Sequence, residues 1–245
     1  MIADEHPPRR DIDLLIVRQL HHAEWEGIRF EDLIFPVFLF ISGLSFPFSY
    51  AKQVLAGLSP ADRHFKVFRR VCALLLLGLV YNGILGTDWH KLADFRYWSV
   101  LGKIGMAWGL AALVYMHFSI KGRLLVCFSG LVGYAVLLGL VAPDAPTGAS
   151  STSLDGCFVG WLDRQFTPGR LYCSGLMEPS GPFVSFFGFP TALLGMLAGD
   201  LVRIESWTPR RRVVALALTG AGLLAIGWLI FSKSSAWKTR RITDG

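Results

Sequence analysis

Six long apolar runs constrain the fold of this chain more than any other feature of its sequence. Each is close to the roughly 20 mostly apolar residues that cross a bilayer as an α-helix. The runs are too long and too continuous for the alternating pattern of a barrel strand. We therefore expect an all-α fold, a polytopic integral membrane helix bundle of about six transmembrane helices. The expected spans are residues 33–50, 68–85, 100–118, 124–142, 183–202 and 213–231.

The composition agrees with a membrane protein. Of the 245 residues, 53% are hydrophobic and 17% are charged, whereas soluble domains carry about 25% charged residues. The net charge of +6 comes largely from basic residues in short connections between apolar runs, which is a topology signal and not a nucleic-acid footprint. We expect the lipid bilayer as a partner and no nucleic acid, and a homo-oligomer stays open.

Three segments follow from this pattern. Residues 1–32 form an N-terminal segment with an interfacial helix and a histidine motif, residues 33–231 form the six-span membrane domain, and residues 232–245 form a polar tail. The membrane domain includes a long loop, residues 143–182.

Lysine and arginine predict the orientation. They gather in the connections 51–67, 119–123 and 203–212, which alternate along the chain and so share one side. The positive-inside rule makes that side cytoplasmic. Residues 1–32 and 143–182 then lie on the opposite side, although the basic C-terminal tail argues against this orientation.

The stretch HHAEWEG, just before the first apolar run, concentrates titratable groups. A histidine such as His22 can act as a general base or nucleophile near neutral pH, and Asp32 is the best-placed carboxylate to orient it. The residues alone favour an interfacial histidine. Trp25 is either an interfacial anchor or a wall on which a sugar ring stacks.

Several motifs, in order, resemble the heparan-α-glucosaminide N-acetyltransferase family and its bacterial relatives. The first is H-A-x-W-x-G, beginning at His22 and followed by DLIFPVFLFISG. The later ones are RYWSVLGKIG from Arg96, WLDRQFTPGRLY, EPSG at residues 178–181, and FPTALLGMLAGDLVR. They cover roughly residues 20–235. Family members carry further helices before and after this region, so we expect the chain to lack the first and last helices.

The resemblance implies a multi-span membrane acyltransferase that takes acetyl-CoA from the cytosolic side and acetylates an amino sugar on the far side. Acetyl-CoA is then a co-substrate, and the motif histidine, His22, is the catalytic residue, on the non-cytoplasmic side. A bacterial inner (cytoplasmic) membrane is the expected location.

Other polar residues are candidates for binding. Asn82 lies near the outer end of the second span, where a polar side chain marks a site or bonds a neighbouring helix. Arg96 and Lys103 could bind anionic groups, and Arg96 could equally be a snorkelling residue that flanks the span. Arg69 and Arg70 are available for the phosphates of CoA at the cytoplasmic mouth, although for each one singly a topology signal is the stronger interpretation.

The remaining polar residues favour structural roles. We expect Asp163 and Arg164 to be a solvated loop pair, and His64, His90 and His117 to be interfacial. Cys157 and Cys173 either pair as a disulfide or stay free thiols. No CxxC spacing or histidine cluster is present, so we expect no metal.

Two other functional classes stay open. The chain could be a non-catalytic transporter subunit, although intramembrane polar residues, the usual mark of a transport path, are few. It could also be an inactive fragment of an acyltransferase of the family above.

Overall fold

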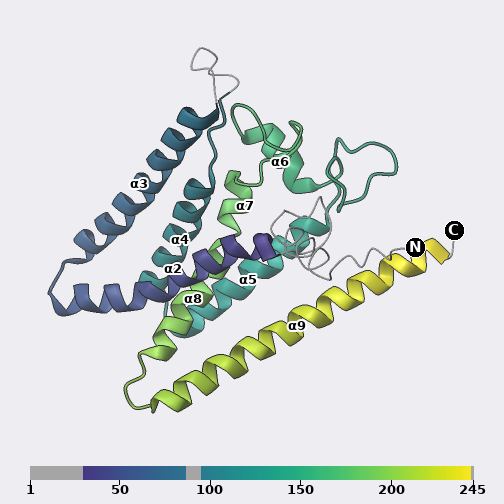
Figure 1. Ribbon diagram of the computed structural model, residues 1–245. Helices are drawn as coiled ribbons and strands as arrows, with labels where there is room; N and C mark the ends of the chain where they lie inside the picture. The colour runs from purple at the N-terminus through teal and green to yellow at the C-terminus, as the bar shows by residue number, and fades with distance from the viewer. Residues whose placement is uncertain (1–29, 87–94, 244–245) are drawn as a thin grey trace, which may run out of the picture. The chain divides into compact units, whose positions relative to one another are not determined.

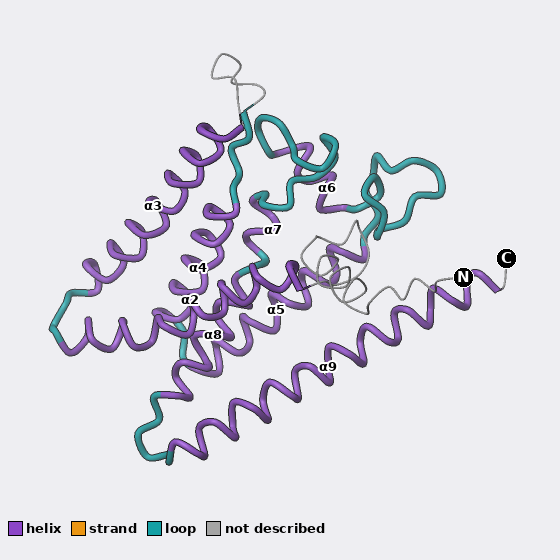
Figure 2. The backbone as a smooth tube through the Cα atoms, in the orientation of Figure 1, coloured by secondary structure: helices purple, strands orange, loops and turns teal. Residues whose placement is uncertain are grey.

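The computed structural model describes residues 30–86 and 95–243. Every regular element in this part of the chain is a helix, and its loops contain only isolated β-bridges (Figures 1 and 2). The helices are α2 (Phe30–Leu55), α3 (Pro60–Gly86), α4 (Val100–His117), α5 (Ile120–Gly139), α6 (Phe158–Phe166), α7 (Pro182–Phe186), α8 (Phe189–Val202) and α9 (Pro209–Thr243). The all-α helix bundle expected from the sequence is confirmed.

Five helical segments are long and apolar enough to cross a membrane: α2, α4, α5, α7 with α8, and α9 from Pro209 to Leu229. The sixth expected span, residues 68–85, is helical and is not among these five segments of the described residues. It belongs to α3, which opens with the charged stretch PADRHFKVFRR before its apolar part begins. The expected boundaries also moved, because the fifth span breaks between α7 and α8 and α5 ends at Gly139. Val141 instead forms a β-bridge with Cys157.

The chain divides into two compact units, Met1–Met196 and Leu197–Gly245. The first unit contains the described helices from α2 to most of α8 and holds both sites described below. The second contains the end of α8 and the long helix α9. Each unit is described by itself.

Helices α3 and α4 form an antiparallel pair within the first unit (Figure 1). Glycines on α4 permit the close approach, because a Cβ at Gly105 or Gly109 would press against Leu74 or Val71 of α3. Small side chains let helix backbones approach in this way in membrane proteins. α4 is the central helix, and its buried face carries Ala107, Trp108, Gly109, Ala111, Ala112 and Tyr115.

The core joins α4 to α2 and α8. Trp108 is 3% exposed, meets Phe46 of α2 edge-to-face at 5.4 Å, and donates its indole N–H to the carbonyl oxygen of Ser42 at 3.3 Å. Leu193 and Met196 of α8 are fully buried in the same cluster. α2 and α8 interlock through glycine. A Cβ at Gly43 would overlap the carbonyl oxygen of Ala192.

We predict that Gly43→Ala lowers the stability of the bundle by about 1–3 kcal/mol, the usual cost of overpacking. Alanine normally stabilises a helix interior relative to glycine, so the loss would come from the blocked contact with Ala192. Thermal unfolding in detergent measures it. Gly220→Ala is the matched control, because a Cβ there meets no atom within 4 Å. A Gly43→Ala variant as stable as Gly220→Ala would contradict the close packing.

Candidate functional site: a closed polar cluster and a basic cavity

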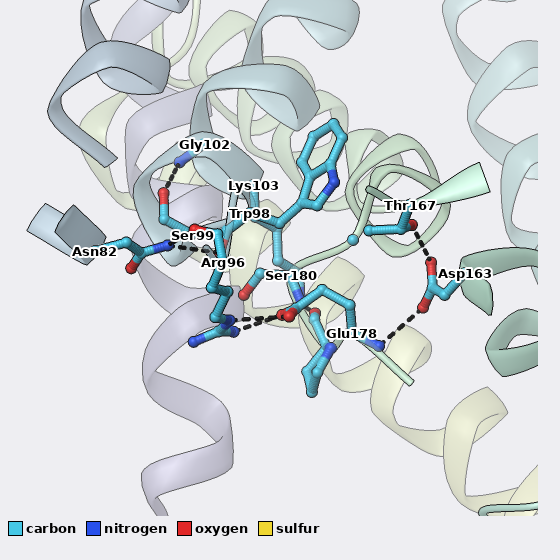
Figure 3. Close-up of polar contacts among 12 residues, drawn as sticks. Asn82, Arg96, Trp98, Ser99, Gly102, Lys103, Asp163, Thr167, Glu178 and Ser180 are labelled. Atoms are coloured by element: carbon cyan, nitrogen blue, oxygen red, sulfur yellow. Dashed lines mark hydrogen bonds and ion pairs between the residues drawn. The ribbon is translucent and has the colours of Figure 1, made fainter. Parts of the chain in front are cut away.

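An ion pair between Arg96 and Glu178 lies at the centre of the polar cluster in Figure 3. The guanidinium donates from Nε to Glu178 Oε2 at 2.9 Å and from Nη2 to Oε1. This two-pronged geometry is the strong form of an arginine–carboxylate contact. The Glu178 side chain is 1% exposed and that of Arg96 is 28% exposed. The hydrogen bond to Glu178 raises the pKa of Arg96 above its ordinary value, so the guanidinium stays charged.

Backbone pairing presents Arg96 to this partner. Arg96 forms an antiparallel β-bridge with Gly169, and the amide of Arg170 donates to the carbonyl oxygen of Phe95 at 3.3 Å. Gly169 has a φ of +80°, and a Cβ there would overlap the Phe95 oxygen. Glycine is therefore required at this position, where the long loop meets the segment that leads into α4.

Asn82 fixes the same segment from the side of α3. Its amide nitrogen donates to the carbonyl oxygens of Arg96 and Trp98, both at 2.9 Å (Figure 3). The hydroxyl of Ser99 then caps α4 by accepting from the amide of Gly102 at 3.0 Å. Ser, Thr, Asp and Asn are the preferred residues at this capping position. α4 therefore begins where α3 holds its leading segment.

Lys103, on the first turn of α4, reaches the segment that carries Glu178. Its ammonium donates to the carbonyl oxygen of Pro179 at 2.9 Å. It also lies 4.2 Å from the centre of the Phe35 ring, a cation–π contact with α2. This contact brings the first turns of α2 to the same end of the bundle as Glu178. Asp32, the predicted orienting carboxylate, lies half-buried one turn before Phe35.

Asp163 is the second buried acid of the cluster. It lies on α6, is fully buried, and accepts from the amide of Glu178 at 3.0 Å and from the Thr167 hydroxyl at 3.4 Å (Figure 3). Burial raises the pKa of Asp163 to about 6, and the charge of Glu178 adds to the shift. The expectation of a solvated Asp163–Arg164 pair is wrong, because Arg164 instead pairs with Asp144 at 2.8 Å.

The second site is a cavity of about 920 Å³ at the opposite end of the α3–α4 pair, next to the connection between α2 and α3. It contains the two predicted cofactor residues, Arg69 and Arg70. Arg70 packs on the face of Trp108, 4.1 Å from the ring centre, and donates to the Ser42 hydroxyl at 3.5 Å. The basic residues that line the cavity are Lys52, Arg63, Lys66, Arg69 and Arg70.

The structure therefore brings three predicted substrate residues together, namely Asn82, Arg96 and Lys103, and separates them from Arg69 and Arg70. The predicted His22 and Trp25 lie outside the described residues. Cys157 and Cys173 are both free thiols. A search against protein-family models and a search of curated proteins found no match to the chain.

Sequence analysis missed the roles of Glu178 and Asp163. Both lie in stretches that were noted for their resemblance, EPSG and WLDRQFTPGRLY. A buried acid is rare unless it is paired, so composition alone gives no reason to expect either of these two to be buried. Asp163 and Glu178 are 15 residues apart in sequence, and their contact depends on a loop path that no periodic pattern predicts.

We predict that the stability of the wild type falls relative to Asp163→Asn as pH rises from about 4 to 6. A carboxyl group whose pKa is raised on folding, here from 3.8 to about 6, binds more protons folded than unfolded in this window, so the folded state loses stability as pH rises. The asparagine variant lacks this titration.

Unfolding is measured in detergent between pH 4 and 7 for both proteins. The free energy of unfolding of the wild type minus that of Asp163→Asn should fall by about 2–3 kcal/mol across this range. A difference that stays constant across this range would contradict the buried ionisable acid.

Proposed function

We propose that the chain is a membrane acetyltransferase that moves an acetyl group from acetyl-CoA to the amine of an amino sugar. One observation supports this most. The stretches that resemble the acetyltransferase family and begin at Arg96, at Trp161 and at Glu178 are far apart in sequence, yet they share one hydrogen-bonded cluster.

The basic cavity supports the second half of the proposal. CoA carries a 3′-phosphate and a pyrophosphate, and five basic side chains line a cavity large enough for part of such a molecule. α4 runs from the Arg96 cluster to the cavity. Lys103 belongs to the cluster, and Trp108 and Met116, which line the cavity, follow it by about 8 Å and about 20 Å along the helix at 1.5 Å per residue. A donor entering on the cytoplasmic side and an acceptor on the far side fit this separation.

The chemistry requires a group that removes a proton from the acceptor amine or carries the acetyl group. His22 is the proposed catalytic residue, because neutral imidazole does either near neutral pH. α2 begins at Phe30, and Phe35 contacts Lys103, so the chain that leads from His22 enters the bundle at the end of the cluster. Asp32 is the proposed orienting group for the imidazole.

The cluster itself would position the acceptor site. Glu178 accepts from Arg96 and from the amide of Ser180 at 3.1 Å, so its carboxylate is largely occupied. Asn82 and Lys103 hold backbone carbonyls. We therefore assign Asn82 and Lys103 first to holding the backbone around the acceptor site. The ammonium of Lys103 and the exposed part of Arg96 would also contact hydroxyls or anionic groups of the substrate.

Acetyl transfer to glucosamine tests the proposal directly. The full chain in detergent or vesicles is mixed with acetyl-CoA, and N-acetylglucosamine is measured by mass spectrometry. We expect His22→Ala to lower the rate by about 10²–10⁴-fold, the usual contribution of a general base. The matched control, His21→Ala, should retain most of the activity because the motif spacing to Trp25 selects position 22.

The same assay tests the cavity. Arg69→Gln should raise the KM for acetyl-CoA with a smaller effect on kcat, because an exposed phosphate contact contributes to donor binding. Arg210→Gln, an exposed arginine outside the cavity, is its control. Activity of His22→Ala equal to that of the wild type would overturn the mechanism, and a wild-type chain without transfer would overturn the function.

A further inference from the structure

Two histidines meet where α3 begins and α4 ends. His64 lies on the first turns of α3 and His117 is the last residue of α4. Their Nε2 atoms are 3.3 Å apart, and their ring centres are 5.0 Å apart at an angle of 57°. The rings are therefore tilted end to end and do not stack.

The other ring nitrogens define the protonation state. Nδ1 of His64 lies 2.6 Å from the carbonyl oxygen of Pro60, and Nδ1 of His117 lies 2.8 Å from that of Leu113. A carbonyl oxygen only accepts, so each Nδ1 carries a proton. In a neutral ring of this tautomer, Nε2 carries no proton and presents a lone pair. Two lone pairs at this distance repel unless a cation lies between them.

The geometry fits a metal ion better than a shared proton. Two nitrogens that bind a tetrahedral ion at 2.0–2.1 Å are about 3.3 Å apart, with ring centres about 5.2 Å apart. A hydrogen bond between nitrogens at 3.3 Å would be longer than the usual range of about 2.7–3.2 Å for protein hydrogen bonds. Metal-binding histidines also usually donate their second N–H to a backbone carbonyl or carboxylate, as both rings do here.

Two arginines close in sequence to the histidines, Arg63 and Arg123, make their contacts with other groups. Arg63 donates to the Tyr50 hydroxyl at 2.8 Å and lies over that ring. Arg123 lies 3.6 Å from the centre of the Tyr115 ring and donates to the carbonyl oxygen of Phe118. Both guanidinium groups are therefore held on aromatic faces.

We propose that His64 and His117 bind one first-row divalent ion, with Zn²⁺, Co²⁺, Ni²⁺ and Cu²⁺ as the class that imidazole ligands favour. Water would complete the coordination, since the described residues contain no group of three or more His, Cys, Asp or Glu side chains suited to a metal. The sequence analysis expected no metal, because the sequence has no CxxC spacing and no histidine cluster. The two proposed ligands are 53 residues apart.

The ion would join the first turns of α3 to the last turn of α4. The residues next to each ligand, Arg63 and Met116, line the basic cavity, so the ion would fix one edge of that cavity. The proposal is independent of acetyl transfer, because it concerns metal binding alone.

Co²⁺ binding to the full chain in detergent tests it. The protein carries no polyhistidine tag and is first stripped with EDTA, and bound metal is measured by equilibrium dialysis. We expect one Co²⁺ per chain at this site, and at least a tenfold weaker affinity in both His64→Gln and His117→Gln. The double variant should bind no more weakly than the weaker single variant, because either ligand alone leaves an incomplete site. His90→Gln is the control and should retain wild-type affinity.

A second measurement needs no variant. Diethylpyrocarbonate modifies free imidazole nitrogens, and mass spectrometry of the digested wild type reports each histidine separately. Zn²⁺ should protect the peptides that carry His64 and His117 and leave the other histidines reactive. Metal binding unchanged in both single variants, protection at other histidines only, or no bound metal would each overturn the proposal.

Discussion

The ion pair between Arg96 and Glu178 is the contact on which the polar end of the bundle depends. It crosses 82 residues of sequence and ties the segment before α4 to the long loop. Removing one partner would leave a buried charge uncompensated, which usually costs several kcal/mol. Asn82, Lys103 and Asp163 each make their hydrogen bond to the backbone of one of the two paired segments. The pair therefore joins the two segments that these residues hold, the one that leads into α4 and the long loop.

A chain with so much apolar surface needs such a contact for specificity. Apolar faces of helices are close to interchangeable in lipid, since a leucine gains little by leaving lipid for another helix. Glycine contacts such as Gly43 with Ala192 fix how closely helices approach. The polar cluster fixes the orientation of the segment before α4 relative to the long loop, because a two-pronged arginine–carboxylate contact tolerates little rotation or sliding. The basic cavity and the histidine pair lie at the other end of the same α3–α4 pair.

Sequence predicted the helical class and most helix positions because apolar length is a local property. It also selected Asn82, Arg96 and Lys103, because a polar side chain within or beside a span is a candidate for a binding site. It gave Asp163 the wrong environment, because burial of an acid depends on partners from a distant segment. It could not predict the break at Phe187 and Gly188 or the pairing of His64 with His117. Both depend on packing between helices, as in the contact of Gly188 with Ala107.

A double-mutant cycle between Arg96 and Glu178 measures the central contact most directly. The variants Arg96→Gln, Glu178→Gln and their combination keep the side-chain sizes similar and remove one or both charges. Unfolding of each in detergent gives the coupling free energy. We expect each single variant to be destabilised and the coupling to be about 2 kcal/mol, in the range for groups within one network. Additive losses, with a coupling within about 0.3 kcal/mol of zero, would contradict the role assigned to this ion pair.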